Sequence, residues 1–228
     1  MDRGRSDKPG SSENTLLGNL RLALSDAVLI EDQTERLLEG AAIIAEAVAD
    51  LGVNPVVVGG LAVAYWSRTR YTTGEIDFLM PKREDVIERL EALGFEQSLP
   101  RHWVFDQTIA FEAPGAQLDD GDEAEPIKLA SGRTVLIMSI EDMVLWRVRE
   151  FLHWKDSRGF RHVLYMLGSS SLDRQRLEHR ARETGLAAAL RYIERAADEI
   201  RGGRRFETWE IKEAAEQLGE TPPTIEES

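Results

Sequence analysis

The hydrophobic pattern in the first part of the chain alternates between helical and extended segments. Apolar residues recur at intervals of three and four over residues 33–51, which predicts an amphipathic helix that ends at Gly52. The β-branched run at 55–58 predicts a short buried strand, and the apolar run at 61–66 predicts a buried helix. Two glycines separate the strand from the helix, so the expected order is strand, glycine turn, helix.

The same alternation continues to about residue 138. We predict a helix over residues 83–93, ended by Gly94, and a surface loop over the acidic stretch 119–125. Further strands, which make about five with the first, are predicted at residues 76–80, 103–105, 108–111 and 134–138. Strands that alternate with helices predict an α/β fold built on a mixed, twisted sheet.

The pattern becomes wholly helical after Ser139, which is the expected N-cap of the next helix with Asp142 three positions later. The predicted helices lie at residues 141–154, 157–167, 173–201 and 209–218. We therefore divide the chain into four regions. These are a disordered polar tail at 1–14, an α/β domain at 15–138, a helical region at 139–205, and a short helix with an acidic tail at 206–228.

Composition narrows the possible partners. The 228 residues include 41 acidic and 28 basic side chains, and the net charge of −13 argues against non-specific nucleic-acid binding by the whole surface. The absence of cysteine excludes disulfides and thiolate metal ligands. The start of the chain is polar, and there is no apolar run of about 18 residues. We therefore expect a soluble, cytoplasmic protein without a membrane partner.

The glycine pair Gly59-Gly60 is the first feature with chemical potential. Residues without side chains let the backbone approach phosphate oxygens, and a helix N-terminus adds N–H donors and a positive dipole end. Gly59 and Gly60 are therefore candidate phosphate-binding residues. The alternative is an ordinary strand-to-helix turn.

Two acidic residues follow on the next predicted strand. Glu75 and Asp77 are separated by one residue, so their side chains point to the same face of the sheet. Glu112, at the end of a neighbouring predicted strand, is the candidate third carboxylate, with Asp106 as the alternative. Carboxylates in an apolar segment are costly unless they are paired or bind a metal, and carboxylate oxygens suit Mg²⁺ or Mn²⁺.

Other polar residues near these segments have two interpretations each. Thr72 and Thr73 either hydrogen-bond phosphates or favour the turn, and Arg70 either contacts phosphate or caps a helix C-terminus. Lys155 either steadies the charge of a triphosphate or, with Asp156, forms an interhelical salt-bridge cluster. The arginines of the third region fit a solvated helix surface or an RNA-binding patch.

In their order along the chain, these segments resemble the polymerase-β-like nucleotidyltransferase superfamily, and more closely its small members grouped with the AbiEii toxins. The resemblance covers about residues 33–167. It is carried by residues 56–63, 70–78, 109–114, 139–143 and 153–156, with Arg161. One position departs from the family pattern, which usually has aspartate where this chain has Glu75.

The resemblance implies a nucleotidyltransferase fold and a metal-dependent transfer of a nucleotidyl group from a nucleoside triphosphate to a hydroxyl. The implied acceptors are RNA, tRNA or a protein, and a toxin of this type would have an antitoxin partner. Catalytic roles are implied for Glu75, Asp77, Glu112 and Lys155, of which the three carboxylates would hold Mg²⁺ or Mn²⁺. Nucleotide-binding roles are implied for Gly59, Gly60, Arg70, Thr72 and Thr73.

The departure at Glu75 supports an alternative. The extra methylene of glutamate moves the carboxylate by about one bond length, and Mg²⁺ demands near-ideal octahedral geometry. A catalytically silent binding or regulatory module that keeps the fold is therefore the second interpretation.

Overall fold

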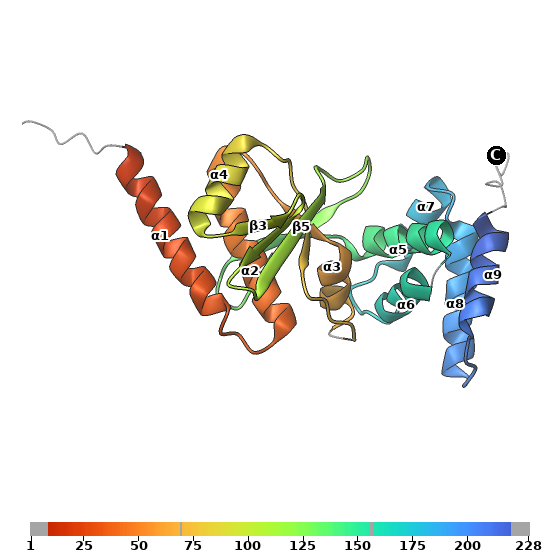
Figure 1. Ribbon diagram of the computed structural model, residues 1–228. Helices are drawn as coiled ribbons and strands as arrows, with labels where there is room; N and C mark the ends of the chain where they lie inside the picture. The colour runs from red at the N-terminus through yellow and green to blue at the C-terminus, as the bar shows by residue number, and fades with distance from the viewer. Residues whose placement is uncertain (1–8, 69, 156, 220–228) are drawn as a thin grey trace, which may run out of the picture. The chain divides into compact units, whose positions relative to one another are not determined.

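The computed structural model describes residues 9–68, 70–155 and 157–219, with side chains from residue 15 onward. The described chain forms two compact units, each with its own internal packing (Figure 1). The first unit takes its residues from Met1–Leu61, Thr73–Asp120 and Ala124–Ile137. The second takes them from Ala62–Thr72, Gly121–Glu123 and Met138–Ser228.

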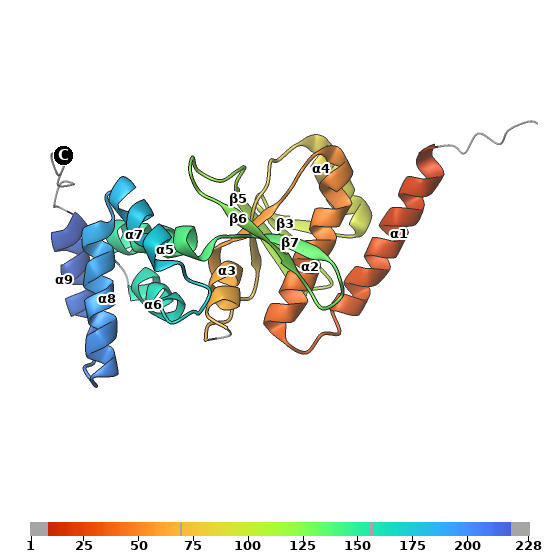
Figure 2. The same cartoon turned by 180° about the vertical axis from the view of Figure 1, so that it is seen from behind.

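The first unit is built on a mixed sheet, seen from its two sides in Figures 1 and 2. In the described residues its strands are β1 (Val56–Val58), β2 (Ile76–Leu79), β3 (Glu96–Leu99), β4 (His102–Phe105), β5 (Ile109–Gly115), β6 (Ala124–Lys128) and β7 (Thr134–Met138). Their order across the sheet is β3-β4-β5-β2-β1-β7-β6. Strand β1 is antiparallel to β2 and parallel to β7, whereas β2 is parallel to β5 and β4 antiparallel to β5. The predicted mixed α/β class is therefore confirmed.

Helices complete this unit. They are α1 (Pro9–Ala27), α2 (Gln33–Val48), the short 3₁₀ helix η1 (Ala49–Leu51), α4 (Glu84–Leu93) and the first turn of α3 (Gly59–Trp66). Helix α2 begins where the Asp32 side chain accepts a hydrogen bond from the Glu35 amide at 2.8 Å, and the segment ends at Gly52 in a left-handed conformation. Helix α1 packs along α2 and α4 (Figures 1 and 2).

Strand β5 shows how the sequence orients the sheet. Ile109, Phe111 and Ala113 are buried, while Ala110 and Glu112 between them are half-buried. The buried set faces the core, where Phe111 packs against Phe78 of β2. Alternate residues of a strand point to opposite faces, so Glu112 lies on the face away from this core.

The second unit is helical. Besides the rest of α3, its helices in the described residues are α5 (Ile140–Trp154), α6 (Ser157–Met166), α7 (Arg174–Glu183), α8 (Ala187–Arg201) and α9 (Thr208–Gly219). As predicted, Ser139 caps α5 by accepting a hydrogen bond from the Asp142 amide. Helices α8 and α9 lie side by side in both views (Figures 1 and 2).

A buried ion network ties the second unit together. The Asp142 side chain is fully buried, and its two oxygens meet Arg176 Nη2 at 2.6 Å and Arg180 Nε at 3.3 Å. Arg176 also pairs with Glu141 at 2.7 Å, and Arg180 with Asp122 at 2.9 Å. We call these five residues the arginine-paired cluster. Arg176 and Arg180 belong to the arginines considered above for an RNA-binding patch, and these two therefore have a structural role.

Burial alone would raise the pKa of Asp142. Hydrogen bonds from the Ser139 hydroxyl, the Glu123 amide and Arg176 outweigh this effect and hold the pKa of Asp142 below its ordinary value. The same pairing raises the pKa of Arg176 and Arg180 against their own burial.

The expected strand count was too low because both edges of the sheet were missed. Strand β3 is fully exposed, and β6 lies in the polar segment where a surface loop was expected to run to residue 125. Neither carries the buried alternation that marks an interior strand. An edge strand can form from backbone pairing without such a pattern.

Two helix boundaries also differ. The single helix expected at 173–201 is two helices, because Gly185 takes a φ of 72° between them and a left-handed residue ends an α-helix. Helix α1 begins at Pro9, so residues 9–14 of the expected tail are helical, which agrees with the preference of proline for the first helical position. Residues 1–8 and 220–228 of the expected tails lie outside the described residues. Within the described part of the chain, no helix combines the length and apolarity needed to cross a bilayer.

Candidate functional site

The turn between β1 and α3 is shaped around one carboxylate. Gly59 has a φ of 60°, and the Gly60 amide donates a hydrogen bond to Asp77 Oδ2 at 2.9 Å. A Cβ atom at position 59 would lie 1.8 Å from that same oxygen. Only glycine fits there, so the immediate role of the glycine pair is to seat the Asp77 side chain.

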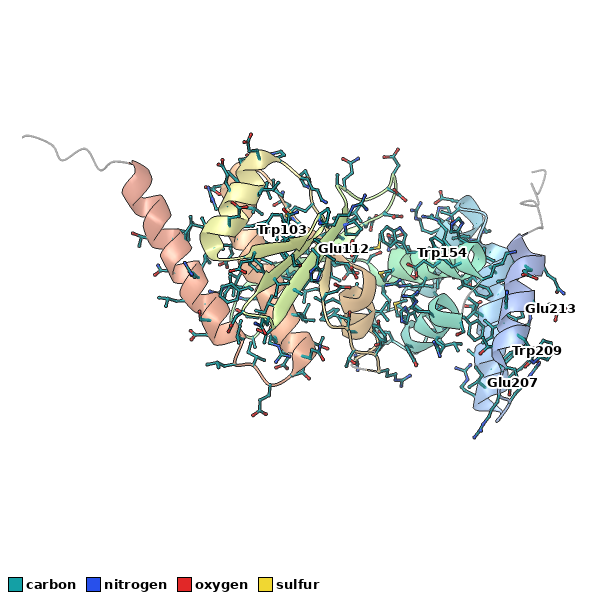
Figure 3. The ribbon with its side chains drawn as sticks, in the orientation of Figure 1. Trp103, Glu112, Trp154, Glu207, Trp209 and Glu213 are labelled. Atoms are coloured by element: carbon teal, nitrogen blue, oxygen red, sulfur yellow. The ribbon has the colours of Figure 1, made fainter. Side chains whose placement is uncertain are left out.

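Neighbouring strands place further side chains in a row with Asp77. Asp77 of β2 pairs with Glu112 of the parallel strand β5, and Glu112 pairs with His102 of the antiparallel strand β4. Directly paired residues lie on the same face of a sheet. Glu75, two residues before Asp77, lies just before β2 and points the same way. Glu112 is labelled on the sheet in Figure 3.

Three carboxylates meet on this face. One oxygen each from Glu75, Asp77 and Glu112 lies within 4.8 Å of the others, and all three residues are half-buried. We call these residues the acidic triad. Oxygens bound to a single Mg²⁺ at about 2.1 Å are no more than about 4.2 Å apart, so small side-chain rotations bring the triad into coordination range. An all-oxygen set of this kind fits a hard divalent cation.

An open cavity of about 530 Å³ adjoins the triad. Its lining residues are Glu75, Leu99, Pro100, Arg101, His102 and Glu112. The cavity gives a substrate room beside two of the three carboxylates. Arg101 adds one positive charge to a wall that also contains two carboxylates and the His102 imidazole.

His102 is the residue at this site that the sequence analysis missed. Its Nε2 lies 3.4 Å from Glu75 Oε2, and its Nδ1 lies 2.6 Å from Ser98 Oγ. A carboxylate can only accept, so Nε2 is the donor when it faces Glu75. The strand predicted at 103–105 stopped one residue short of His102, whereas in the structure Phe105 pairs with Ile109, which places His102 opposite Glu112.

The alternative third carboxylate, Asp106, lies elsewhere. It occupies the turn between β4 and β5 with a φ of 47°, after the last residue of β4, Phe105, and before the first residue of β5, Ile109. Glu112 is near the other end of β5, and it is Glu112 that joins the triad.

The remaining predicted residues fall into both units. Thr73 of the first unit donates from its hydroxyl to the Glu75 carbonyl at 3.5 Å, which supports the turn interpretation. Thr72 and Arg70 belong to the second unit, and both are exposed. Lys155, also of the second unit, ends α5 with a φ of 51°, and its Nζ lies 3.6 Å from Glu216 Oε1. Asp156 lies outside the described residues.

No family model and no curated protein matches the sequence. Solved structures give distant similarities. One is a crystal structure of an antigenic nucleotidyltransferase-like protein from Paracoccidioides brasiliensis, with 15% identity, coverage of 71% of this chain and 93% of that chain, and a TM-score of 0.47.

Two further structures are of ANT(2'')-Ia. The crystal structure in complex with adenylyl-2''-tobramycin has 17% identity, covers 65% of this chain and 93% of that chain, and gives a TM-score of 0.40. The solution structure of this antibiotic-resistance factor has 17% identity, 71% and 94% coverage and a TM-score of 0.39. For the chain described here, fold and site together define an α/β protein with a candidate centre for a divalent cation.

Proposed function

We propose that this protein is a metal-dependent nucleotidyltransferase that acts on a nucleoside triphosphate and a hydroxyl acceptor. The observation that carries the proposal is the acidic triad, built from adjacent strands beside a glycine turn that only glycine can form. Carboxylates that gather at one point of a sheet repel one another unless a cation lies between them. A divalent cation held there would neutralise phosphate oxygens and orient the acceptor.

In the proposed reaction, the acceptor oxygen forms a bond to the α-phosphorus while the bond to the β-phosphate oxygen breaks. The nucleotidyl group moves to the acceptor, and pyrophosphate leaves. Glu112 lines the cavity and is our candidate to accept the proton of the acceptor hydroxyl. The acidic triad would hold Mg²⁺ or Mn²⁺.

The finer parts of the proposal come from the sequence resemblance. We propose RNA, tRNA or a protein as the acceptor, and a toxin role with an antitoxin partner as the biological setting. Contacts of Arg70, Thr72, Gly60 and Lys155 with the nucleotide remain predictions.

A second candidate function is a catalytically silent module with the same fold. Two features favour it, namely glutamate at position 75 and the use of the Gly60 amide by Asp77 instead of by a phosphate. The two candidate functions differ in whether the site catalyses nucleotidyl transfer.

The experiment is incubation of the purified chain with each α-phosphate-labelled nucleoside triphosphate, Mn²⁺ or Mg²⁺, and total RNA or cell protein. We expect a labelled product that is lost in Glu75→Ala and Asp77→Ala. Glu96→Gln, on the exposed edge strand β3, is the matched control and should keep the activity. The absence of label under every condition, with label appearing in Glu75→Asp, would establish the silent module instead.

A further inference from the structure

A second cavity, of about 300 Å³, lies wholly within the helical unit. Its lining residues are Trp66, Ser67, Arg68, Arg70, Tyr165, Gly168, Ser169 and Ser170. We call it the arginine pocket. The lining comes from the last turns of helices α3 and α6 and from the segments that follow them.

The lining of the arginine pocket consists mostly of hydrogen-bond donors. Two guanidinium groups face hydroxyls from three serines and a tyrosine, and none of the described lining residues carries a carboxylate. Guanidinium groups donate only, and they match the geometry of oxyanions. The lining of this cavity is basic, although the chain as a whole has a net charge of −13.

Two of the three serine hydroxyls keep protons that can be donated, whereas the Ser67 hydroxyl donates to the Ala64 carbonyl at 3.3 Å. Ser170 Oγ accepts from Arg68 Nη2 at 2.7 Å, and Ser169 Oγ accepts from the Ser171 amide at 3.3 Å. A hydroxyl has one donor and two acceptor positions, so each of these bonds leaves the O–H available. An oxygen-rich anion is the ligand that would accept from both.

Arg70 is the second guanidinium of this cavity. Within the described part of the chain, no hydrogen bond or ion pair of its side chain is found, and its Nη1 lies near the wall formed by Gly168. A Cβ atom at position 168 would be 3.4 Å from that nitrogen. Arg68, by contrast, is already engaged by Ser170.

Helix ends give the competing explanation for these arginines. Helices α3 and α6 end at Trp66 and Met166, and a helix C-terminus carries about half a negative charge. Two such ends amount to about one negative charge, whereas two arginines carry two positive charges. Helix capping therefore leaves about one positive charge in the pocket without compensation.

We propose that the arginine pocket binds a phosphate group. The group comes from a nucleotide or from the backbone of a nucleic acid, because both present the same oxyanion. The proposal does not depend on the acidic triad, so phosphate binding and nucleotidyl transfer can fail independently of each other.

The test is a titration of the full chain with inorganic phosphate, without divalent metal, followed by amide NMR spectra of isotopically labelled protein. A buffer with about 0.15 M sodium chloride limits the repulsion by the acidic surface to about 8 Å. We expect saturable shifts at Arg68, Ser169 and Ser170. A charged hydrogen bond to phosphate predicts that Arg70→Gln weakens binding about tenfold or more.

Two further variants make the test specific. Arg205→Gln removes the same charge from an exposed position of the same unit and should leave the affinity unchanged. Arg70→Lys keeps the charge without the planar fork and should bind with intermediate affinity. Equal affinity in the native chain and Arg70→Gln, or equal loss in Arg70→Gln and Arg205→Gln, would overturn the proposal.

Separate arms of the titration identify the source of the phosphate. A nucleoside triphosphate and a short single-stranded oligonucleotide are added in turn, again without metal. Whichever ligand produces the same shifts at a lower concentration than inorganic phosphate is the source. If neither binds more tightly than inorganic phosphate, the pocket holds an adventitious ion only, and the proposal fails.

Discussion

Each of the two units contains a cluster of carboxylates, but the partners of these carboxylates differ between the units. In the arginine-paired cluster of the helical unit, Asp142 is fully buried and held by two guanidinium groups and a serine. In the acidic triad of the sheet unit, Asp77 accepts a hydrogen bond from a backbone amide, and Glu75 faces a histidine. Among the described residues, neither Glu75 nor Glu112 forms an ion pair with a lysine or arginine.

This difference separates a structural role from a functional one. A buried carboxylate enclosed by arginines has its charge neutralised inside the protein, so it has no need of an external cation. The three carboxylates of the acidic triad are half-buried, and the two that line the cavity, Glu75 and Glu112, have charge to spare for a ligand. The helical unit therefore uses its acids for stability, and we propose that the sheet unit uses its acids for chemistry.

The largest effect is expected from breaking the arginine-paired cluster. Asp142→Asn leaves Arg176 and Arg180 without their central partner, and removing one member of a buried ion pair costs about 3–5 kcal/mol. Urea unfolding of the native chain and the variant measures this loss. The exposed Glu178→Gln, which removes a surface pair with Arg182, is the control and should change stability by less than about 1 kcal/mol. A loss of similar size in both variants would contradict the structural role.

The acidic triad should show the reverse behaviour. We expect Asp77→Asn to reduce nucleotidyl transfer by about 10²–10³-fold, because it removes one charge from the site at which the metal and phosphates meet. Its amide oxygen can still accept from Gly60, so unfolding free energy should change by less than about 1 kcal/mol. A variant that loses stability and activity in parallel would place Asp77 in the structural class with Asp142.

The sequence pointed to the acidic triad because each of its carboxylates lies in or next to a segment with a strand pattern of its own. Glu75 and Asp77 are two residues apart, and the buried alternation of β5 fixes the face of Glu112. Two parts could not be predicted in this way. The exposed edge strand β3 has no buried pattern, and Arg176 and its partner Asp142 lie on two different helices, α7 and α5. Long-range ion pairs depend on how helices pack, which a periodic pattern does not specify.

Acid should weaken the arginine-paired cluster through Asp142. Its pKa is lowered in the folded protein, so its stabilising contribution is fully present above the ordinary value of 3.8 and is lost as the pH falls through the lower, folded pKa. The difference in unfolding free energy between the native chain and Asp142→Asn should therefore shrink as the pH falls below about 3.8. Urea unfolding at a series of acidic pH values measures it. A difference that is constant over this range would show that the charge of Asp142 is not what stabilises the unit.

The smallest effect concerns His102, the residue that connects the triad to β4. Its Nε2 faces one oxygen of Glu75, and the Ser98 hydroxyl holds the opposite nitrogen, so the imidazole restrains the longer carboxylate at this position. Loss of such a partner of a metal ligand typically weakens metal affinity by 10–100-fold, and we expect His102→Gln to weaken Mn²⁺ binding by about tenfold.

Calorimetric titration of the full chain with Mn²⁺ measures the affinity of His102→Gln, and His179→Gln on the exposed face of α7 serves as the matched control. Glu75→Asp combined with His102→Gln sharpens the comparison. The shorter aspartate no longer reaches toward the imidazole, so the histidine substitution should have a smaller effect in that background than in the native chain. Equal effects in both backgrounds would mean that His102 acts on the site without going through Glu75.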